Sequence, residues 1–393
     1  MRELPGTRIL PLAVAAAYVG LACTRVDGPG ATAHVDTLPG GALVVRNPDA
    51  GLWRDGEGWR LEEDLRIGAV EGTGPDVFGN VMSLSLAVGA EGHMFVLDGQ
   101  SHEVRVFDAS GTYLRRFGRS GAGPGEMRSP SFAGLSPEGN VLVVDPPNAR
   151  YSTFSPTGVL LASHRRQISY SMYPWPGIAD QTGRIVDLGV APVPPYAQVL
   201  VRANLATAAA DTFPLPSYDG GSFQLLNPAG RPIRSLSIPF AGRLVWRLDP
   251  RGYVWSAITD EYRIVQQRLP GDTVLIVELS RAPAPVSAEE RATALEGLAD
   301  FEVAGGRVDR SQIPSTKPQF HDFMVDDRGY LWVATAGGLD VFGPDGRYLG
   351  VVTGSNLIMW PARPVFRGAY VYGFTLDELH VAYLVRLRVE GRG

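Results

Sequence analysis

Three aspartates, Asp98, Asp145 and Asp187, each stand at the end of an apolar run. Their carboxylates are the acidic groups whose repeated position along the chain could bring them together in a functional site. Carboxylates from separate segments can together bind a divalent cation such as calcium. An aspartate at the end of a strand can equally accept hydrogen bonds from the backbone of the following turn. We favour this second role and expect no cofactor. A calcium-like cation held by these carboxylates is the alternative.

Other residues with catalytic potential are scattered along the chain. The histidines form no pair with metal-ligand spacing on a defined element, so no zinc site is indicated. No nucleophile elbow is present, and no spacing groups a serine with a histidine and an acid. The sequence therefore predicts no assembled catalytic site.

The remaining ligand-binding candidates are Lys317, His321, Trp360 and Arg150. Lys317 and His321 occur in 314-PSTKPQFHDF-323, and Trp360 lies in a proline-rich loop similar to 170-YSMYPWPG-177. Aromatic loops of this kind can form the floor of a ligand site. They can also pack between neighbouring sheets, just as Lys317 can be solvated and His321 packed, and we favour these structural roles.

The glycine-rich stretch 118-GRSGAGP-124 raises the question of phosphate binding. A phosphate-binding loop would place Lys and Ser or Thr after Gly123, but Pro124 and Gly125 stand there. The stretch also joins two predicted strands, so no helix N-terminus is available to an anion. The stretch 68-GAVEGTGP-75 stands before the first full repeat as 118–124 stands before the second, so we interpret both stretches as connectors.

Turn glycines reveal an internal repeat. Gly92 and Gly111, Gly139 and Gly158, and Gly252 and Gly271 are each 19 residues apart and flank alternating apolar runs. Six such runs begin at turn glycines, namely Gly92, Gly139, Gly183, Gly252, Gly329 and Gly368. Short strands recurring every ~40 to 50 residues are typical of propeller blades. The sequence therefore predicts an all-β, six-bladed β-propeller.

The two ends of the repeat region each contain an unpartnered strand. The segment 58–68 alternates apolar and charged residues with the period of a half-buried strand, and the last unit, 368–391, lacks an outer strand. We expect these strands to pair, because this pairing closes the ring and hides exposed sheet edges.

Two gaps in the repeat indicate insertions, at about 206–236 and 282–320. The first offers a turn at 227-NPAG-230 and an added strand. In the second, Ser287 and Glu290 form a capping box before an apolar stripe at helical spacing. We expect one short amphipathic helix on a propeller face, with residues 282–320 covering one mouth of the channel. Shielding of an apolar blade edge is the alternative.

The connector, the turn glycine and the run ending in Asp together resemble the NHL-repeat family of β-propellers, especially exported six-bladed bacterial members. The resemblance implies ligand or protein binding, with lyase or lactonase activity in some relatives. Six-bladed sugar-lactone hydrolases hold a divalent cation in the channel. The family's Asp–Arg pair is matched by Asp145 and Arg150, whereas Glu103 replaces the arginine in the first blade and Arg263 lacks the aspartate.

The N-terminus is typical of an export signal. Residues 1–22 contain Arg2, Arg8 and a 14-residue apolar run that is too short to span a bilayer. The sequence 20-GLAC-23 resembles a bacterial lipobox, and Cys23 is the only cysteine. We expect lipid attachment at Cys23, a flexible linker over 23–41 and the propeller over 42–391. An ordinary secretory signal is the alternative.

Charge and hydropathy restrict the partners. A formal net charge of −5 and a pI near 5.8 disfavour nucleic acid, and no other apolar run is long enough to cross a membrane. We expect a monomeric, non-enzymatic binding scaffold in the cell envelope, anchored only by its lipid, facing the periplasm or exterior, and binding a protein, peptide or glycan. A metal-dependent, lactonase-like hydrolase or lyase using channel carboxylates is the alternative.

Overall fold

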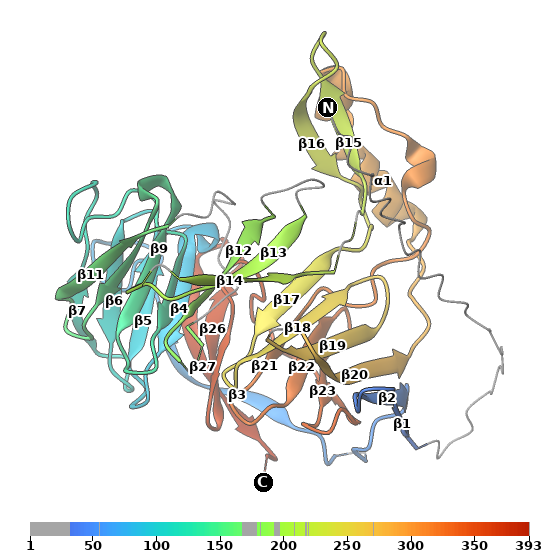
Figure 1. Ribbon diagram of the computed structural model, residues 1–393, viewed down its shortest axis with the longest axis horizontal. Helices are drawn as coiled ribbons and strands as arrows, with labels where there is room; N and C mark the ends of the chain where they lie inside the picture. Colours follow the sequence, from blue (N-terminus) through green and yellow to red (C-terminus); the bar gives the residue numbers. More distant parts are fainter. Residues whose placement is uncertain are drawn as a thin grey trace, which may run out of the picture.

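A computed structural model describes residues 32–392, apart from 55, 167–178, 181, 192–196, 208, 217, 219 and 270. The described chain is nearly all β and forms a six-bladed β-propeller (Figure 1), as the repeat predicts. The export signal, Cys23 and the aromatic loop 170–177 lie outside the described residues.

The blades follow one another in chain order, each an antiparallel sheet. The first two are β4 (Leu84–Val88), β5 (Met94–Asp98), β6 (Glu103–Phe107) and β7 (Tyr113–Phe117), then β8 (Phe132–Leu135), β9 (Val141–Asp145), β10 (Arg150–Phe154) and β11 (Leu160–Arg165). The third and fourth are β12 (Ile185–Val190), β13 (Gln198–Ala203) and β14 (Ala210–Pro214), then β17 (Leu244–Leu248), β18 (Tyr253–Ile258), β19 (Arg263–Arg268) and β20 (Thr273–Ser280). The last two are β21 (Asp322–Val325), β22 (Leu331–Thr335), β23 (Gly338–Phe342) and β24 (Tyr348–Val352), then β25 (Val365–Arg367), β26 (Tyr370–Leu376) and β27 (Ala382–Glu390). In the third blade, Ala179 bridges to Ile185 at the inner edge.

The first turn of each blade explains why the repeat contains glycine. All six predicted turn glycines have φ between 61° and 88°, a region that residues with a Cβ rarely adopt. In three of these turns an aspartate, namely Asp180, Asp249 or Asp326, supports the geometry from the side. Asp249 and Asp326 accept the backbone N–H groups two and four residues later and also accept the indole N–H of Trp255 and Trp332, each at 3.0 Å.

The N-terminal strand closes the ring. β3 (Arg60–Ile67) pairs antiparallel with β27 and becomes the outer strand of the sixth blade, so the predicted pairing of the two ends is confirmed. Trp59, immediately before β3, is 8% exposed, and its ring centroid lies 5.5 Å from that of Trp332 in the fifth blade. Closure therefore buries an aromatic contact as well as a sheet edge.

Two further strands precede β3 and extend the fourth blade. β1 (His34–Thr37) pairs with β2 (Leu43–Pro48), which pairs parallel with β20 to make a six-stranded sheet. Asn47 in β2 donates to the Glu278 carbonyl at 3.0 Å and accepts from the Tyr348 backbone N–H at 2.8 Å, connecting the fourth blade to the fifth. Residues 34–37 are thus a strand, where the sequence predicts linker.

The two insertions pack together. The hairpin of β15 (Ser222–Leu226) and β16 (Pro232–Ser237) turns at 227–230, and α1 (Ala288–Glu296) and α2 (Ala299–Val303) pack against it, standing apart from the blades in Figure 1. We call residues 222–240 and 287–313 the insertion lobe. The capping box at the start of α1 is confirmed: the Ser287 hydroxyl accepts from the Glu290 N–H at 3.1 Å, and the Glu290 carboxylate from the Ser287 N–H at 2.9 Å.

The predicted short helical insertion is confirmed as one bent helical segment, α1 followed directly by α2, and it packs against the other insertion. α1 ends at Gly297, and the following turn places Leu298 and Phe301 against Phe223 and Ile238 of the hairpin segment. The apolar residues of the helical segment therefore form a small core with the other insertion. Among the described residues, no helix is long and apolar enough to cross a membrane.

Candidate functional site

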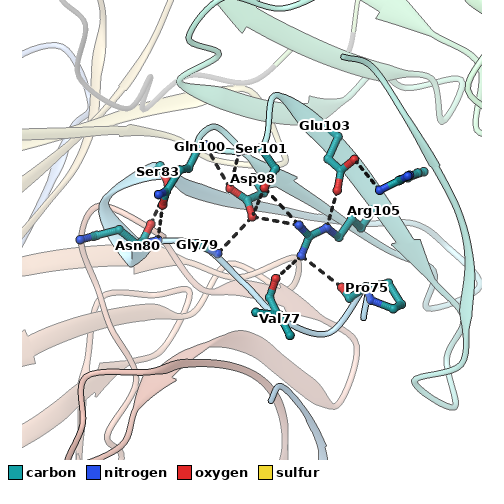
Figure 2. A network of polar contacts seen from close by, with 11 residues as sticks. Pro75, Val77, Gly79, Asn80, Ser83, Asp98, Gln100, Ser101, Glu103 and Arg105 are labelled. Carbon is teal, nitrogen blue, oxygen red and sulfur yellow. Dashed lines mark hydrogen bonds and ion pairs between the residues drawn. The ribbon is translucent and has the colours of Figure 1, made fainter. Parts of the chain in front are cut away.

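Asp98, at the end of β5, holds the connector that enters its own blade (Figure 2). Its fully buried carboxylate accepts hydrogen bonds from the backbone N–H groups of Gly79, Gln100 and Ser101, each at 3.1 Å. Gln100 and Ser101 belong to the turn after β5, whereas Gly79 belongs to the connector between β3 and β4. The carboxylate thus fixes the turn and the connector together, as the turn-capping interpretation predicts.

Arg105 completes this arrangement from the neighbouring strand β6. Its guanidinium lies 3.3 Å from Asp98 and 2.8 Å from Glu103, and it donates to the backbone carbonyls of Pro75 and Val77 in the same connector (Figure 2). The arginine that pairs with the first-blade aspartate is therefore two residues beyond Glu103. All of these contacts are with the protein's own backbone and side chains.

The second blade repeats the arrangement. Asp145 accepts the Arg128 backbone N–H at 3.0 Å, and Arg150 donates to the carbonyls of Ala122, at 3.1 Å, and Glu126. Arg150 stands opposite Asp145 in the β9–β10 register, but in the described residues its guanidinium bonds to the connector rather than to that carboxylate. The Asp–Arg pattern of the repeat therefore serves to fasten connectors.

The glycine-rich connector 118–124 surrounds a carboxylate of the protein itself. Glu126 accepts the Gly123 N–H at 2.7 Å and Arg119 at 2.9 Å, and these contacts lower the pKa of its carboxyl group. A Cβ on Gly121, where φ is 148°, would lie 2.1 Å from a Glu126 carboxylate oxygen. The glycines thus make room for an internal anion, so the interpretation as a connector holds.

Asp187, the third predicted carboxylate, links the second and third blades. It accepts the Tyr151 hydroxyl, pairs with Arg166 at 2.8 and 3.2 Å, and accepts the backbone N–H of Leu188 at 2.7 Å. Burial, and then the negative charge of Asp187, raise the pKa of Tyr151, so the phenol stays protonated and donates. Among the described residues, no group of three or more histidine, cysteine or acidic side chains is arranged to hold a metal ion.

Lys317, His321 and Trp360 have separate surroundings. The Lys317 ammonium lies 2.7 Å from the Glu290 carboxylate, which ties the segment before β21 to the start of α1. The carbonyl of His321 accepts from Arg243 at 2.7 Å, and burial followed by the charge of Arg243 lowers the pKa of its imidazole. Trp360 is 37% exposed, ahead of β25.

A cavity of the described structure lies in the central channel. It encloses about 600 Å³, a volume typical of small-molecule sites. The inner segments of all six blades line it, represented by Leu86, Ala133, Ala179, Leu248, Val325 and Val365. None of the seven ligand-binding candidates named from the sequence lines this cavity. Its walls are mainly apolar, so the polar residues among them decide its chemistry.

Three arginines line the cavity, Arg247, Arg363 and Arg367, together with the acidic residues Glu138, Asp180 and Asp327. Arg247, in β17, is 8% exposed and forms an ion pair with Asp322 at the start of β21. Arg363 precedes β25 and also lines the cavity. Arg243, four residues before Arg247, adds another nearby guanidinium, whose positive charge lowers the pKa values of Arg247 and Arg363.

The pKa values of two of these arginines respond to this crowding. Burial and, after it, the positive charges of Arg247 and Arg243 together lower the pKa of Arg363 to about 9, although Asp322 opposes them. Burial likewise lowers the pKa of Arg247, against the effect of Asp322. The channel lining thus carries charged side chains of both signs.

Sequence reasoning missed this cluster. In 244-LVWRLD-249 the arginine follows an apolar alternation like that of an outer strand, and Asp322 and Arg363 lie far along the chain. The available signal was a charged residue in the first strand of a blade, the strand that faces the channel. That signal can be recognised only after the inner and outer strands have been assigned. The turn glycines are the sequence feature that makes this assignment.

Comparison with known proteins places the chain by its fold. No family model matches the sequence, and no curated protein matches it. Among solved structures, a member of the DUF4221 family from Bacteroides vulgatus has a TM-score of 0.54 at 11% identity, over 84% of this chain and 98% of that one.

Two enzymes are similar at lower TM-scores. The virginiamycin B lyase of Staphylococcus aureus gives 0.45 at 9% identity, over 84% of this chain and 99% of that one. A gluconolactonase from Xanthomonas campestris gives 0.39 at 11% identity, over 79% and 88%. At these identities the comparisons show the propeller fold alone.

Proposed function

We propose that this protein is a non-enzymatic binding module that captures a ligand in the central channel of its propeller. The observation that carries the proposal is the cavity of about 600 Å³ lined by all six blades. A rigid ring of sheets keeps such a cavity formed without a ligand, which lowers the entropic cost of binding. The resemblance of the repeats to NHL propellers, which commonly bind ligands or proteins, supports the same function.

The carboxylates on which a lactonase-like mechanism would depend support a structural role instead. Asp98, Asp145 and Asp187 each accept backbone N–H groups and so stabilise turns, connectors and blade contacts. The ligand that we propose is a small molecule, or a terminal group of a peptide or glycan, that enters the channel. We propose that the protein acts as a monomer.

Occupying the cavity with a side chain tests the proposal. Val365 lines the channel and is half-buried, so Val365→Trp is expected to fill part of the cavity and weaken the binding of channel ligands at least tenfold. Val351→Trp is the matched control, since Val351 is 41% exposed on the outer strand β24. A library of small molecules and short peptides is screened by ligand-observed NMR. Equal binding to both variants and the wild type would contradict channel binding.

We further propose that a lipid at Cys23 anchors the protein in the cell envelope, with the propeller outside the cytoplasm. The lipobox-like sequence 20-GLAC-23 and the single cysteine support this placement. Cys23→Ser is expected to release the protein from the membrane fraction, or to leave it unprocessed. Intact mass of the wild type is expected to show diacylglyceryl on the first residue after cleavage. An unmodified wild type whose membrane association equals that of the variant would exclude the anchor.

A further inference from the structure

The inner strands of the blades have a free edge that borders the channel. β4, β8, β17, β21 and β25 each stand at the end of their sheet, pair with a single neighbour and contribute residues to the cavity lining. In a strand of this kind, alternate residues bond to the neighbour, and the residues between them direct their backbone N–H and C=O groups the other way. The register therefore decides which backbone groups point into the channel.

One such residue from each blade stands at the same level of the ring. In β4 the Gly89 N–H bonds to the His93 carbonyl, which sets an alternation in which Leu86 and Val88 direct their backbone groups away from β5. The turn bonds and registers of the other blades give the equivalent positions. We call these six cavity-lining residues the edge ring: Val88, Leu135, Ala179, Leu248, Val325 and Phe366.

Two residues earlier in these strands, side chains of the protein take up the corresponding backbone groups. Ser85 accepts from the Ala133 N–H at 3.2 Å and donates to the Ala133 carbonyl at 3.4 Å. Asp322 accepts the Phe323 N–H at 2.7 Å. No side chain in the described part of the chain does this at the edge ring. The edge ring therefore leaves its N–H and C=O groups to water or to a ligand.

The strand β4 provides the longest stretch of such groups, because Leu86 and Val88 both line the cavity. Their channel-facing groups are two residues apart, about 6.8 Å in a strand, and an extended peptide repeats its donors and acceptors with the same period. The hydroxyl groups of a sugar radiate from a ring and have no such period. Charged side chains of both signs line the cavity, so the backbone edge is the feature that selects a ligand.

We propose that the ligand of the channel is a short peptide in extended conformation, which adds to the free edge of β4 by pairing with Leu86 and Val88. This inference rests on the proposed function of the channel. In recognition by strand addition, main-chain hydrogen bonds supply affinity and pockets hold the side chains. Here the apolar walls of the cavity, among them Leu248 and Phe366, would contact the side chains of the peptide.

A binding screen with wild-type protein identifies the probe. The first arm is a library of tetrapeptides of apolar and small residues, acetylated and amidated so that they carry no terminal charge, and the second arm is a panel of neutral mono- and disaccharides. Ligand-observed NMR detects binding, and Val365→Trp provides the blocked channel. We expect the best peptides to bind the wild type at least tenfold more tightly than this variant and more tightly than any saccharide.

Residue-resolved hydrogen exchange of the wild type tests the pairing with β4. The N–H groups of Leu86 and Val88 are expected to exchange quickly without ligand and to slow about tenfold or more when the best peptide is saturating. Those of Ser85 and Ala87, which the register bonds to β5, should exchange slowly in both states. Fast exchange at Leu86 and Val88 with peptide bound would overturn the inference. Slow exchange there without ligand would also overturn it, because these groups would already be bonded.

Methylation of the peptide nitrogens tests the strand geometry from the side of the ligand. An extended peptide that pairs with β4 along one edge directs every second N–H group to that strand. Methylation of these nitrogens is expected to weaken binding about 10- to 100-fold, and methylation of the nitrogens between them by less than about fivefold. Isothermal titration measures both series. Equal effects at all positions would contradict pairing along one edge.

A variant removes one donor on the side of the protein. Proline is accepted in an edge strand where the N–H lies outside the ladder, and Val88→Pro is expected to weaken peptide binding about tenfold or more. Val351→Pro is the matched control, because the Val351 N–H points away from β23 at the outer edge of the fifth blade. Melting curves establish that both variants are folded. If Val88→Pro unfolds, hydrogen exchange and peptide methylation decide the matter on the wild type.

Two results separate this inference from the proposed function. Saccharides that bind the wild type but not Val365→Trp, with no binding of any peptide, would overturn the peptide inference and leave channel binding intact. Failure of every peptide, saccharide and small molecule to bind the wild type would overturn both.

Discussion

At the residue scale, one type of side chain performs three structural tasks in this propeller. Asp98 fastens a connector, Asp326 supports a glycine turn and a tryptophan, and Asp187 joins two blades. In each case the carboxylate accepts several N–H or O–H groups at once, which an ionised carboxylate can do from a buried position. The repeated aspartates are therefore explained by the demands of the fold.

Replacing Asp98 tests this explanation. Asp98→Asn leaves Arg105 buried beside a neutral amide and removes an acceptor from three backbone N–H groups. We expect a loss of about 3–5 kcal/mol in the free energy of unfolding, measured by urea denaturation. Asp345→Asn, on the exposed turn before β24, is expected to change it by less than about 0.5 kcal/mol. Equal effects of the two changes would contradict the role of Asp98 in fastening the connector.

His321 gives a prediction about pH. Burial and the charge of Arg243 hold its folded-state pKa below 6.5, so the unfolded chain takes up the proton first as pH falls. The contribution of this histidine is therefore fully present above pH 6.5 and is lost as pH falls towards the lower folded pKa. We expect the urea midpoint of the wild type to drop more between pH 7.5 and 5.5 than that of His321→Gln. His34→Gln, at an exposed histidine, is the control, and identical drops in wild type and His321→Gln would contradict the prediction.

At the element scale, the strands and turns could be predicted because the repeat makes them local. A turn glycine followed by an alternating apolar run identifies each inner hairpin, and the capping box at Ser287 identifies the start of α1. The packing of the two insertions could not be predicted. Phe223 and Phe301 lie in separate gaps of the repeat, and neither segment contains a local sequence signal that indicates packing against the other.

Removing the helices tests how the insertion lobe is held. Replacing residues 284–312 with a short Gly/Ser linker removes Leu298 and Phe301 and so exposes Phe223 and Ile238. We expect faster amide hydrogen exchange throughout β15 and β16, with unchanged exchange in β17 to β20, because the hairpin loses its core while the blade keeps its own. Phe301→Ala, which leaves the helices in place, is expected to give a smaller effect in the same strands. Unchanged protection of the hairpin would show that it is stable alone.

At the scale of the whole molecule, ring closure was predictable and the channel chemistry was not. Two complementary orphan strands at the ends of the repeat region leave one way to complete six blades. The extra pairing of β2 with β20 has no such signal, because the fourth blade already has four strands. The arginine cluster arises only when the ring brings the inner strands of the fourth, fifth and sixth blades together around one cavity.

A separate peptide that contains the sequence of β3 should be able to close the ring of a protein that lacks this strand. A variant beginning at residue 57 keeps β3 but lacks β1 and β2, whereas one beginning at residue 69 lacks all three strands. Trp59 and Ile67 are 8% and 7% exposed, and burial of two such side chains contributes several kcal/mol, a large share of a typical stability of about 5–15 kcal/mol. We therefore expect the variant that begins at residue 69 to lose a cooperative melt and the variant that begins at residue 57 to keep it.

A synthetic peptide of residues 57–68 is expected to restore the melt of the shorter variant in a concentration-dependent way, because binding to the folded state raises Tm by mass action. The same peptide carrying Trp59→Ala and Ile67→Ala keeps the backbone pairing groups but loses the two buried side chains, and it should fail to restore the melt. Differential scanning calorimetry of both variants, with and without each peptide, decides the matter. If the variant beginning at residue 69 melts as cooperatively as the one beginning at 57, the sixth blade is stable with three strands and β3 does not close the ring.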